Sequence, residues 1–493
     1  MEAVSVLHFG KRQRGHVAPG QAAGLGRILP AAGNRNGTSL NNAGSNGNYW
    51  SSSLNENNSD NARNVNFNSE DVNRNNNNRY NGFSVRPVSE HTMNCSAPIF
   101  DTLPNRLLLD LYRAWKDARR HKRSKDYQLS FERNAESELR RLRDAILSGK
   151  YRPGRSTCFI IHDPKMREVF AAQFRDRVVH HLLYNYIAPH LIPGFIRDSY
   201  SCIPGRGTHD GILRLEENIC KVSCNYSQPC YILKLDIKGY FMHIDRARLL
   251  DICRDALEPF QERLNYPLVN YLLEVIIRDD PTENCRRQGP LSDWEGLPDS
   301  KSLFHSPPGC GLPIGNLTSQ LFSNVYMDVF DKYLVSLVGE GRYGRYVDDA
   351  YVVGSSKAEL RRIIPLAEAF LRTELGLSVN RNKIAIHSAY RGVEFLGAYL
   401  KPYRRYVSNR TRDRMLKKVE RLEYVYDPVV RWRSLNSFLG ITSHYRAYNL
   451  RIKEIIPRVP SAFDEGYYLN SALKYVMKRP SGNRIRTTSG QIP

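Results

Sequence analysis

Residues 343–353 read YGRYVDDAYVV, in which two runs rich in Tyr and Val flank the neighbouring acids Asp348 and Asp349. Tyr and Val favour extended strands, so the stretch predicts two short strands around a tight turn. Adjacent carboxylates at the tip of a turn repel each other, and a divalent cation that binds their oxygens removes this cost. The stretch is therefore a candidate metal site, although an Asp-Asp pair alone is more often part of a solvated loop.

A third acid, Asp236, directly follows the apolar run YILKL of residues 231–235, which reads as a buried strand. A lone Asp after a strand is usually a turn residue, so its interpretation depends on the Asp-Asp pair. Two cations about 4 Å apart lower the pKa of an attacking hydroxyl and stabilise a leaving pyrophosphate. Mg²⁺ is the favoured ion, because it accepts few carboxylates and keeps positions for phosphate oxygens.

Helical patterns surround these strands. The apolar residues of 317–329 recur at helical spacing, and a further helix is predicted over 134–149. Residues 356–359, SKAE, form a capping box that opens a helix to about Leu375. Residues 401–478 are basic and mostly helical in pattern. Strands and helices alternate irregularly, which indicates the α+β class with a mixed or antiparallel sheet.

The charge balance indicates a polyanionic partner. The 493 residues carry 72 Lys and Arg against 50 Asp and Glu, a net charge of +22, and nucleic acid is the first candidate. We find no apolar run of about 18 residues and no signal peptide, so we expect no membrane contact. Nine cysteines are too few for a disulfide scaffold and fit a reducing cytoplasm. Cys220, Cys224 and Cys230 lack the paired spacing of zinc sites.

The N-terminal part has a different composition. Residues 34–81 contain 19 asparagines in 48 positions, and asparagine is a poor helix and strand former. Such a segment buries too little apolar surface to offset its chain entropy. We therefore predict disorder over residues 1–92.

Seven motifs, in order, resemble those of reverse transcriptases over roughly residues 100–455. YVDD at 346–349 resembles the YxDD box, and Asp236 followed by Phe241 resembles the first catalytic motif. RDRVV at 175–179 and RDSYS at 197–201 are similar to finger motifs of bacterial members, and GLPIGNLTSQ at 311–320 is similar to the template- and nucleotide-handling motif. LGL at 375–377 with Lys383 is similar to the lysine motif, and GVEFLG at 392–397 is similar to the primer grip.

The resemblance implies a right-hand polymerase, with fingers and palm at 93–400, a helical thumb at 401–456 and a basic C-terminal tail at 457–493. The implied reaction is attack of a primer 3′-hydroxyl on a deoxynucleoside triphosphate, templated by RNA and aided by two Mg²⁺. The implied partners are an RNA template, a DNA primer and dNTPs.

The resemblance also implies the role of each residue in catalysis. Asp236, Asp348 and the Ile237 carbonyl would hold the metals, with Asp349 as the secondary carboxylate. Lys383 would protonate the leaving pyrophosphate or neutralise its charge.

The implied binding residues form two sets. Phe241 would be a steric gate against a ribose 2′-OH, and Gly315 would let the backbone approach the nucleotide. The other expected nucleotide-binding residues are Lys165, Arg167, Tyr240 and Ile314. The expected template and primer residues are Ser319, Gln320, Gly392, Phe395, Leu396 and Gly397.

Two positions depart from the common family pattern. Most reverse transcriptases carry Gln where this chain has Ile314, and Ser-Pro at residues 319–320, where it has Ser-Gln. Ile314 cannot donate the hydrogen bonds of Gln, so discrimination between right and wrong pairs should weaken. This combination resembles the reverse transcriptases of diversity-generating retroelements. That type implies mutagenic retrohoming: copying of a template-repeat RNA with low fidelity at adenines, aided by a small basic accessory variability protein.

The resemblance gives residues 1–92 a second interpretation. Residues 49–53, YWSSS, and 82–88, GFSVRPV, resemble the C-terminal end of a C-type-lectin-fold variable protein. The segment would then be a translated template repeat joined to the polymerase, with Met93 as the better start; the alternative is a functional Asn-rich tail. We expect a cytoplasmic enzyme of bacterial or phage origin. The alternative functions are a group II intron-like or retron-like reverse transcriptase, and a catalytically silent RNA-binding scaffold.

Overall fold

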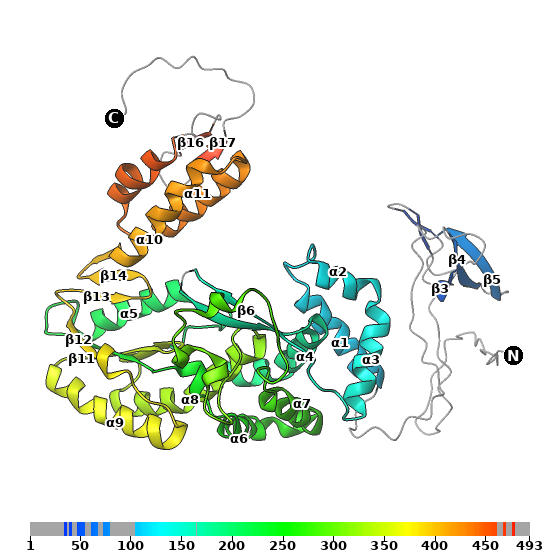
Figure 1. Cartoon of the computed structure of the whole chain (residues 1–493), viewed down its shortest axis with the longest axis horizontal. Coiled ribbons are helices and arrows are strands. Elements are labelled where there is room, and N and C mark those ends of the chain that lie inside the picture. The colour runs from blue at the N-terminus through cyan, green and yellow to red at the C-terminus, as the bar shows by residue number, and fades with distance from the viewer. Residues whose placement is uncertain are drawn as a thin grey trace, which may run out of the picture. The chain divides into compact units, whose positions relative to one another are not determined.

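The structure is a computed structural model (Figure 1) that describes residues 104–163 and 165–460 with their side chains. Outside these ranges it describes only short strands, between residues 34 and 78 and at 467–469 and 476–478, and there the side chain of Met477 alone. The chain divides into two compact units, Met1–Asn94 and Cys95–Pro493. In the part with side chains, no helix is both long and apolar enough to cross a membrane.

The centre of the larger unit is a four-stranded antiparallel sheet of order β10-β11-β8-β12. It contains the predicted hairpin and the predicted buried strand. The bounds are Tyr231–Asp236 for β8, Tyr343–Tyr346 for β10, Asp349–Gly354 for β11 and Ala385–Ser388 for β12. The prediction of mixed helices and strands with an antiparallel sheet is therefore confirmed.

Helices cover both faces of this sheet (Figure 1) because side chains alternate along each strand. Leu233 and Leu235 of β8 belong to the main core, which includes α8 (Leu317–Val338) and α9 (Lys357–Leu375). Ile232 of β8 faces the opposite core, built with α5 (Thr208–Val222). Half of the predicted capping box is present, because Ser356 Oγ accepts a hydrogen bond of 3.1 Å from the Glu359 amide. The Glu359 carboxylate accepts from the amide of Ser355, one residue before the N-cap, at 3.1 Å.

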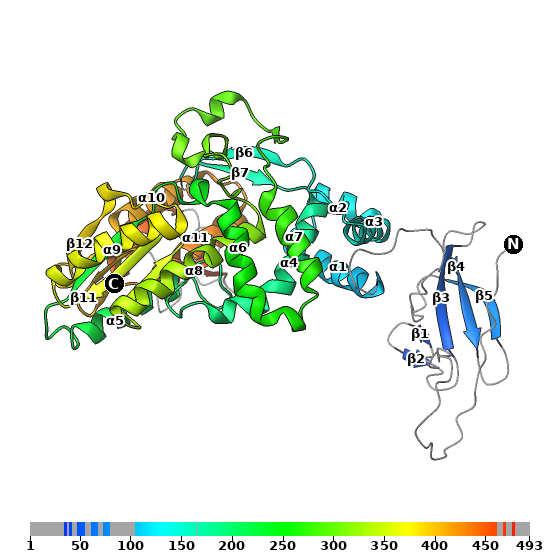
Figure 2. The same cartoon turned by 90° about the horizontal axis from the view of Figure 1, so that it is seen from below.

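Two smaller sheets flank the central one. The first has the order β7-β6-β9 and is separate from β11 and β12 (Figure 2), and the second has the order β13-β14-β15. Their bounds are Thr157–Ile161 for β6, Arg167–Ala171 for β7, Arg286–Arg287 for β9, Val393–Phe395 for β13, Ala398–Lys401 for β14 and Arg404–Val407 for β15.

Helices make up most of the remaining larger unit. The helix predicted over 134–149 is α3, Ala135–Leu147. The others are α1 Pro104–Ala118, α2 Asp126–Arg133, α4 Phe174–Leu191, α6 Arg246–Leu257, α7 Tyr266–Arg278, α10 Asn409–Glu420 and α11 Pro428–Thr442. The basic stretch 401–478 contains α10 and α11 as predicted. It also begins within a strand pair, β14 and β15, where basic and β-favouring residues mix.

Within residues 1–92 the structure differs from the predicted disorder at five strands. They are β1 Asn34–Asn36, β2 Ser39–Asn41, β3 Gly47–Leu54, β4 Asn61–Phe67 and β5 Val72–Asn78. The β3-β4-β5 register pairs the apolar positions Tyr49 with Val65, and Phe67 with Val72. Strand propensity depends strongly on context in a sheet, which is why composition alone misses these strands. The rest of this prediction lies outside the described residues.

A buried histidine joins α4 to the first turn of α8. His180 Nδ1 lies 2.7 Å from the Thr318 hydroxyl, and both side chains are buried. Burial lowers the pKa of His180 to about 4, helped by the positive charges of His181 and Arg177. The folded protein therefore keeps His180 neutral at pH values where the unfolded chain protonates it.

We predict a pH-dependent stability from this histidine. Between pH 6.5 and 4 the unfolded chain binds the extra proton, so the unfolding free energy falls as pH falls, by about 3 kcal/mol from this group. His180→Gln should flatten this slope in urea unfolding, whereas Thr318→Val, which keeps the buried imidazole, should retain it. Equal slopes for His180→Gln and the unsubstituted protein would contradict the prediction.

Candidate active site

The three predicted acids meet where β8 and β11 run side by side. In the antiparallel register Asp236 lies opposite Asp349, although 113 positions separate them along the chain. The Ile237 amide donates to the Asp348 carbonyl at 3.3 Å. Ile237 also bridges to Val379, and the Asp236 carbonyl accepts from the Asn380 amide at 2.7 Å. The structure thus brings Asp236, Ile237, Asp348 and Asp349 together as predicted.

The turn between β10 and β11 has a strained backbone at Val347, whose φ is +57°. A β-branched residue rarely adopts this conformation, which costs about 1–3 kcal/mol unless its surroundings fix it. The Val347 amide donates to Ser201 Oγ at 3.2 Å, and the Val347 carbonyl accepts from Arg345 Nη1 at 2.9 Å. These two contacts hold the turn that carries Asp348.

Arg345 is held in turn by a buried ion pair with Asp331 of α8. Arg345 Nε and Nη2 lie 2.7 and 2.6 Å from the two Asp331 oxygens, and each side chain is 1% exposed. The Tyr343 hydroxyl donates to the same carboxylate at 2.7 Å. Burial lowers the pKa of Arg345, but the charge and hydrogen bonds of Asp331 raise it above its ordinary value. Arg345 is therefore charged and fixed beneath the turn.

Residues 198–201 also support the hairpin. The Tyr200 amide donates to the Arg345 carbonyl at 3.0 Å, and the Arg345 amide donates to the Asp198 carbonyl at 2.8 Å. The Tyr200 and Tyr351 hydroxyls lie 2.7 Å apart in the interior. This segment, which the resemblance assigns to the fingers, packs beside β10. The sequence contains no local signal for these contacts, nor for the pairing of Arg345 with Asp331.

The carboxylates at the hairpin carry an excess of negative charge. The pKa of Asp348 is raised to about 6, first by burial and then by the charges of Asp349 and Asp236. Lys383 acts in the opposite direction on that pKa. Its Nζ lies 2.8 and 2.9 Å from the two Asp236 oxygens, and Asn380 Nδ2 donates to one of them at 3.3 Å. Lys383 therefore neutralises only part of the charge.

The donor set suits a divalent cation, although its members do not face one point. Among the described residues, no three His, Cys, Asp or Glu side chains are gathered as a ready metal site. The Asp236 carboxylate instead faces Lys383. The raised pKa of Asp348 shows that added positive charge would stabilise the group, and oxygen-rich sites favour hard cations. Asp236, Asp348 and the Ile237 carbonyl would hold the ion, with Asp349 beside them.

The predicted nucleotide residues Tyr240 and Phe241 follow β8. Tyr240 is buried and its hydroxyl donates to the Ser323 carbonyl, while Phe241 is half-buried, with ring centroids 5.2 Å apart. Ile314 is half-buried, and its carbonyl accepts from the Phe170 amide of β7 at 2.8 Å. Gly315 has a φ of +128°, and an added Cβ would lie 2.8 Å from the Phe170 carbonyl. The structure thus explains this glycine by its approach to β7; its approach to a nucleotide remains a prediction.

The remaining predicted residues are divided between surface and interior. Lys165 and Arg167 are exposed on the β6–β7 hairpin, and Gln320 is exposed on α8. Ser319 and Phe395 are buried, so they support their surroundings rather than face solvent. Gly392, Leu396 and Gly397 all have positive φ, before β13 and at its turn into β14.

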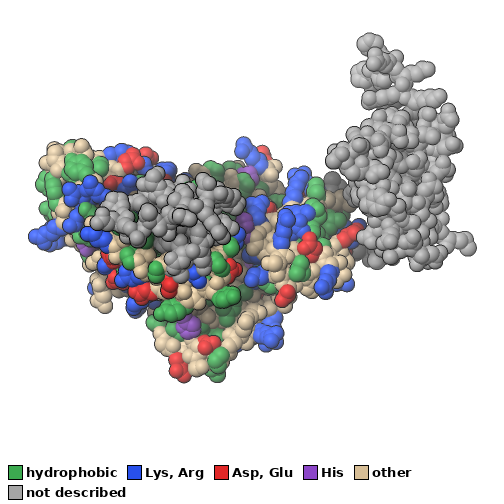
Figure 3. All heavy atoms as spheres, turned by 90° about the horizontal axis from the view of Figure 1, so that it is seen from above, with side chains coloured by type: hydrophobic (Ala, Val, Ile, Leu, Met, Phe, Trp, Pro, Cys, Tyr) green, Lys and Arg blue, Asp and Glu red, His purple; other side chains and the backbone are tan. Residues whose placement is uncertain are grey.

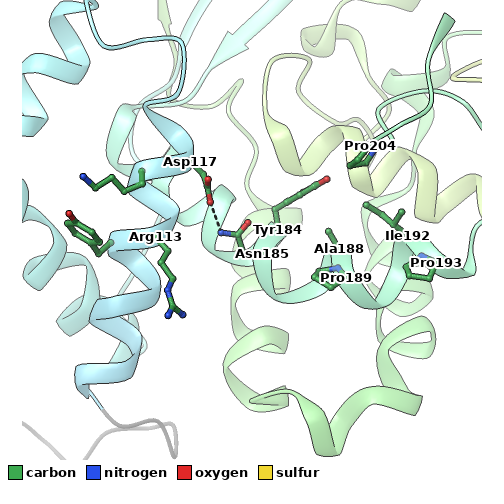
Figure 4. Close-up of a pocket in the computed structure, with 11 residues that line it drawn as sticks. Arg113, Asp117, Tyr184, Asn185, Ala188, Pro189, Ile192, Pro193 and Pro204 are labelled. Carbon is green, nitrogen blue, oxygen red and sulfur yellow. Dashed lines mark hydrogen bonds between the residues drawn. The ribbon is translucent and has the colours of Figure 1, made fainter. Parts of the chain in front are cut away.

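A cavity among the described residues lies elsewhere. It has a volume of about 690 Å³ and lies between α1 and α4 (Figure 4). Its lining includes Tyr112, Arg113, Tyr184 and Asn185, and none of the predicted site residues. The carboxylates therefore lie outside this cavity.

We predict that the buried ion pair sets the stability of the hairpin. Arg345→Met leaves Asp331 buried without its cation and should lower the unfolding free energy by about 3–5 kcal/mol. The double variant Arg345→Met/Asp331→Leu should lose less, because no buried charge remains. Arg141→Met breaks an exposed pair with Glu138 and should cost under about 1 kcal/mol. A loss for Arg345→Met as small as that of Arg141→Met would contradict this account.

Comparisons with known proteins find a family model over the part of the chain that carries the three acids. The family model described as reverse transcriptase (RNA-dependent DNA polymerase) matches residues 162–400. A model for a domain of unknown function matches residues 16–88. Protein YkfC of Escherichia coli (strain K12) is 24% identical over 294 residues, which cover 53% of this chain and 70% of that protein.

Solved structures show only a remote likeness. Apo telomerase from Candida tropicalis, truncated from its C-terminal domain, has 12% identity and a TM-score of 0.38, and the match covers 52% of this chain. Telomerase from Candida albicans in complex with a fragment of telomeric RNA has 10% identity and a TM-score of 0.38, over 64% of this chain. The chain spans 56% of the length of either structure. Residues 162–400, which contain all three acids, therefore match a model of the family described as reverse transcriptase (RNA-dependent DNA polymerase).

Proposed function

We propose that the whole chain acts as an RNA-directed DNA polymerase in which Asp236, Asp348 and Asp349 carry catalysis. The observation that supports this most strongly is the β8–β11 register, which places Asp236 opposite Asp349 beside the strained turn. A primer 3′-hydroxyl would attack the α-phosphate of a dNTP at this edge of the sheet. The net charge of +22 favours an RNA–DNA duplex as the bound polyanion.

Two Mg²⁺ ions would supply acid catalysis here, by activating the primer hydroxyl and stabilising the pyrophosphate charge. The chain's own residues would do the rest. Asp236, Asp348 and the Ile237 carbonyl would bind the ions, and the Arg345–Asp331 pair would hold the hairpin in place. Lys383, 59% exposed, would be free to carry a proton toward the leaving pyrophosphate once an ion replaces it at Asp236.

The polymerase subdivisions follow from this assignment. We assign fingers and palm to residues 93–400, the thumb to 401–456 and a basic tail to 457–493. Lys and Arg side chains are spread over the visible face of the described part (Figure 3). On α10, the exposed Arg410 and Lys417 and the half-buried Arg414 would contact phosphates of the bound duplex.

Ile314 supports a more specific assignment, to the polymerase of a diversity-generating retroelement. Its apolar side chain offers a nucleotide no hydrogen bond, which favours low fidelity at template adenines. In this assignment the chain copies a template-repeat RNA for mutagenic retrohoming, together with a small basic accessory variability protein. The alternatives remain a group II intron-like or retron-like enzyme, and a silent RNA-binding scaffold.

Residues 1–92 would be a translated template repeat in this assignment. The domain model that matches residues 16–88 ends just before the proposed boundary, which supports treating the segment separately. A near-identical copy elsewhere in the genome, differing only at adenines of the coding strand, is expected. A genome without such a copy would favour the functional Asn-rich tail.

Primer extension tests the proposed catalysis. On an RNA template, Asp236→Asn and Asp348→Asn should each lower the extension rate by at least about a thousandfold. Each substitution removes a carboxylate that would hold a cation, and this cation would stabilise the negative charge of the transition state. Asp413→Asn, which changes an exposed acid on α10, should retain full activity. Chelation of divalent cations should abolish extension, and Mg²⁺ should restore it. Full activity in the Asp348→Asn variant would contradict the mechanism. An unsubstituted protein that binds RNA but extends no primer would favour the silent RNA-binding scaffold.

Misincorporation tests the role of Ile314. Ile314→Gln restores hydrogen-bonding groups at the pocket and should lower misincorporation opposite template adenine by about tenfold. Ile314→Val keeps an apolar side chain and should leave the error rate high. The rate is measured by sequencing cDNA made from a defined RNA. Equal error rates for Ile314→Gln and Ile314→Val would remove the argument for the retroelement type.

A further inference from the structure

A buried carboxylate on β7 has no part in the site described above. Residues alternate along this strand, so Glu168 and Phe170 share its buried face and are each 1% exposed. Removing a carboxylate from water costs several kcal/mol unless hydrogen bonds satisfy it. The partners of Glu168 should therefore show what its burial achieves.

Glu168 is satisfied by donors more than 120 positions further along the chain. Oε1 accepts from Trp294 Nε1 at 2.7 Å and from Ser302 Oγ at 3.1 Å, and Oε2 accepts from the Leu303 amide at 2.6 Å. All three donors are uncharged groups. Hydrogen bonds to an ionised acceptor are about twice as strong as neutral ones, so Glu168 fixes these donors in place.

The donors belong to residues 291–306, which we call the back-wall segment. Its regular structure consists of three short 3-10 turns, Leu291–Trp294, Asp299–Lys301 and Leu303–His305. Such short turns do not fix their own position, because isolated helical turns are unstable in water. The position of the segment therefore depends on tertiary contacts, and Glu168 supplies three of them.

The back-wall segment packs against the predicted nucleotide pocket. Leu303 shares a buried cluster with Cys158, Phe170 and Met242. Half-buried side chains complete this cluster, and they include Trp294 and Phe304 from the segment together with Phe241 and Ile314 from the pocket. The Phe170 and Phe304 ring centroids lie 5.7 Å apart.

Backbone contacts extend this coupling. The Leu312 amide donates to the Phe241 carbonyl at 2.8 Å, and the Phe170 amide donates to the Ile314 carbonyl at 2.8 Å. A Cβ on Gly311 would lie only 2.5 Å from Leu303 Cδ1, so this backbone and the segment are in close contact. Close-packed interiors transmit a shift of one side chain to its neighbours. A displaced Leu303 would therefore move Gly311, and with it Ile314.

We propose that Glu168 is a positioning residue for nucleotide selection, because it holds the back-wall segment against Phe241 and Ile314. The proposal rests on the proposed polymerase function and deepens it. Phe241 and Ile314 contact the incoming nucleotide in that function, and Glu168 acts through them. Loss of Glu168 would let Phe241 and Ile314 move where they face the sugar of the incoming nucleotide, and would leave the three catalytic carboxylates in place.

Selection between deoxynucleotides and ribonucleotides tests this role. Glu168→Ala should lower the preference for dNTP over rNTP by at least about fivefold, through a raised KM for dNTP with kcat within about twofold. Glu168→Gln keeps one acceptor oxygen and should fall between Glu168→Ala and the unsubstituted protein. Glu295→Ala changes an exposed acid next to Trp294 and is the matched control. An unchanged preference in folded Glu168→Ala would overturn the proposal.

If Glu168→Ala does not fold, Trp294→Phe removes a single hydrogen bond with little loss of volume. It should shift the preference in the same direction by a smaller factor, and no shift would overturn the proposal.

Amide hydrogen exchange tests the coupling between Glu168 and the nucleotide pocket without a polymerase assay. Glu168→Ala should raise exchange at Leu303, Phe170 and Leu312, and leave α9 unchanged. Faster exchange confined to residues 291–306 would overturn the proposal. An unsubstituted protein that extends no primer would instead count against the polymerase function, while the exchange experiment would still test the role of Glu168.

Discussion

The buried ion pair between Arg345 and Asp331 is the interaction on which the site depends. It joins α8 to β10 with both side chains 1% exposed, and Arg345 also donates to the carbonyl of the strained Val347. A buried ion pair gains little net stability over an apolar pair, but it is costly to break. Here it fixes a turn of unusual backbone conformation, and this turn presents Asp348 beside the end of β8.

The arrangement that results is electrostatically unfavourable by itself. Asp236, Asp348 and Asp349 lie around one strand end, and the raised pKa of Asp348 reflects its burial and the charges of the other two. Lys383 offsets part of this charge at Asp236. Functional sites often keep such unfavourable charge where a ligand or ion will complete it. The proposed Mg²⁺ ions and the triphosphate would complete it here.

Local patterns were enough to predict the elements that carry the acids. Apolar residues mark β8, two runs rich in Tyr and Val mark the hairpin, and Ser356 caps α9 as its sequence indicates. Contacts between residues far apart in the sequence have no comparable local pattern that would predict them. Nothing near Arg345 points to Asp331, and nothing near Glu168 points to Trp294, because these pairs form only when distant segments pack. The strands within residues 34–78 were missed for a different reason: they pair with their neighbours in sequence, but their many asparagines disfavour strands on composition.

In the proposed mechanism, Asp236 and the hairpin carboxylates would share a divalent cation. Mn²⁺ binding, followed by electron paramagnetic resonance without nucleic acid or nucleotide, measures this directly. If these residues share the ion, Asp236→Asn and Asp348→Asn should each weaken Mn²⁺ binding by at least about tenfold, and Asp413→Asn should leave it unchanged. Equal Mn²⁺ affinity in all four proteins would contradict the proposed mechanism.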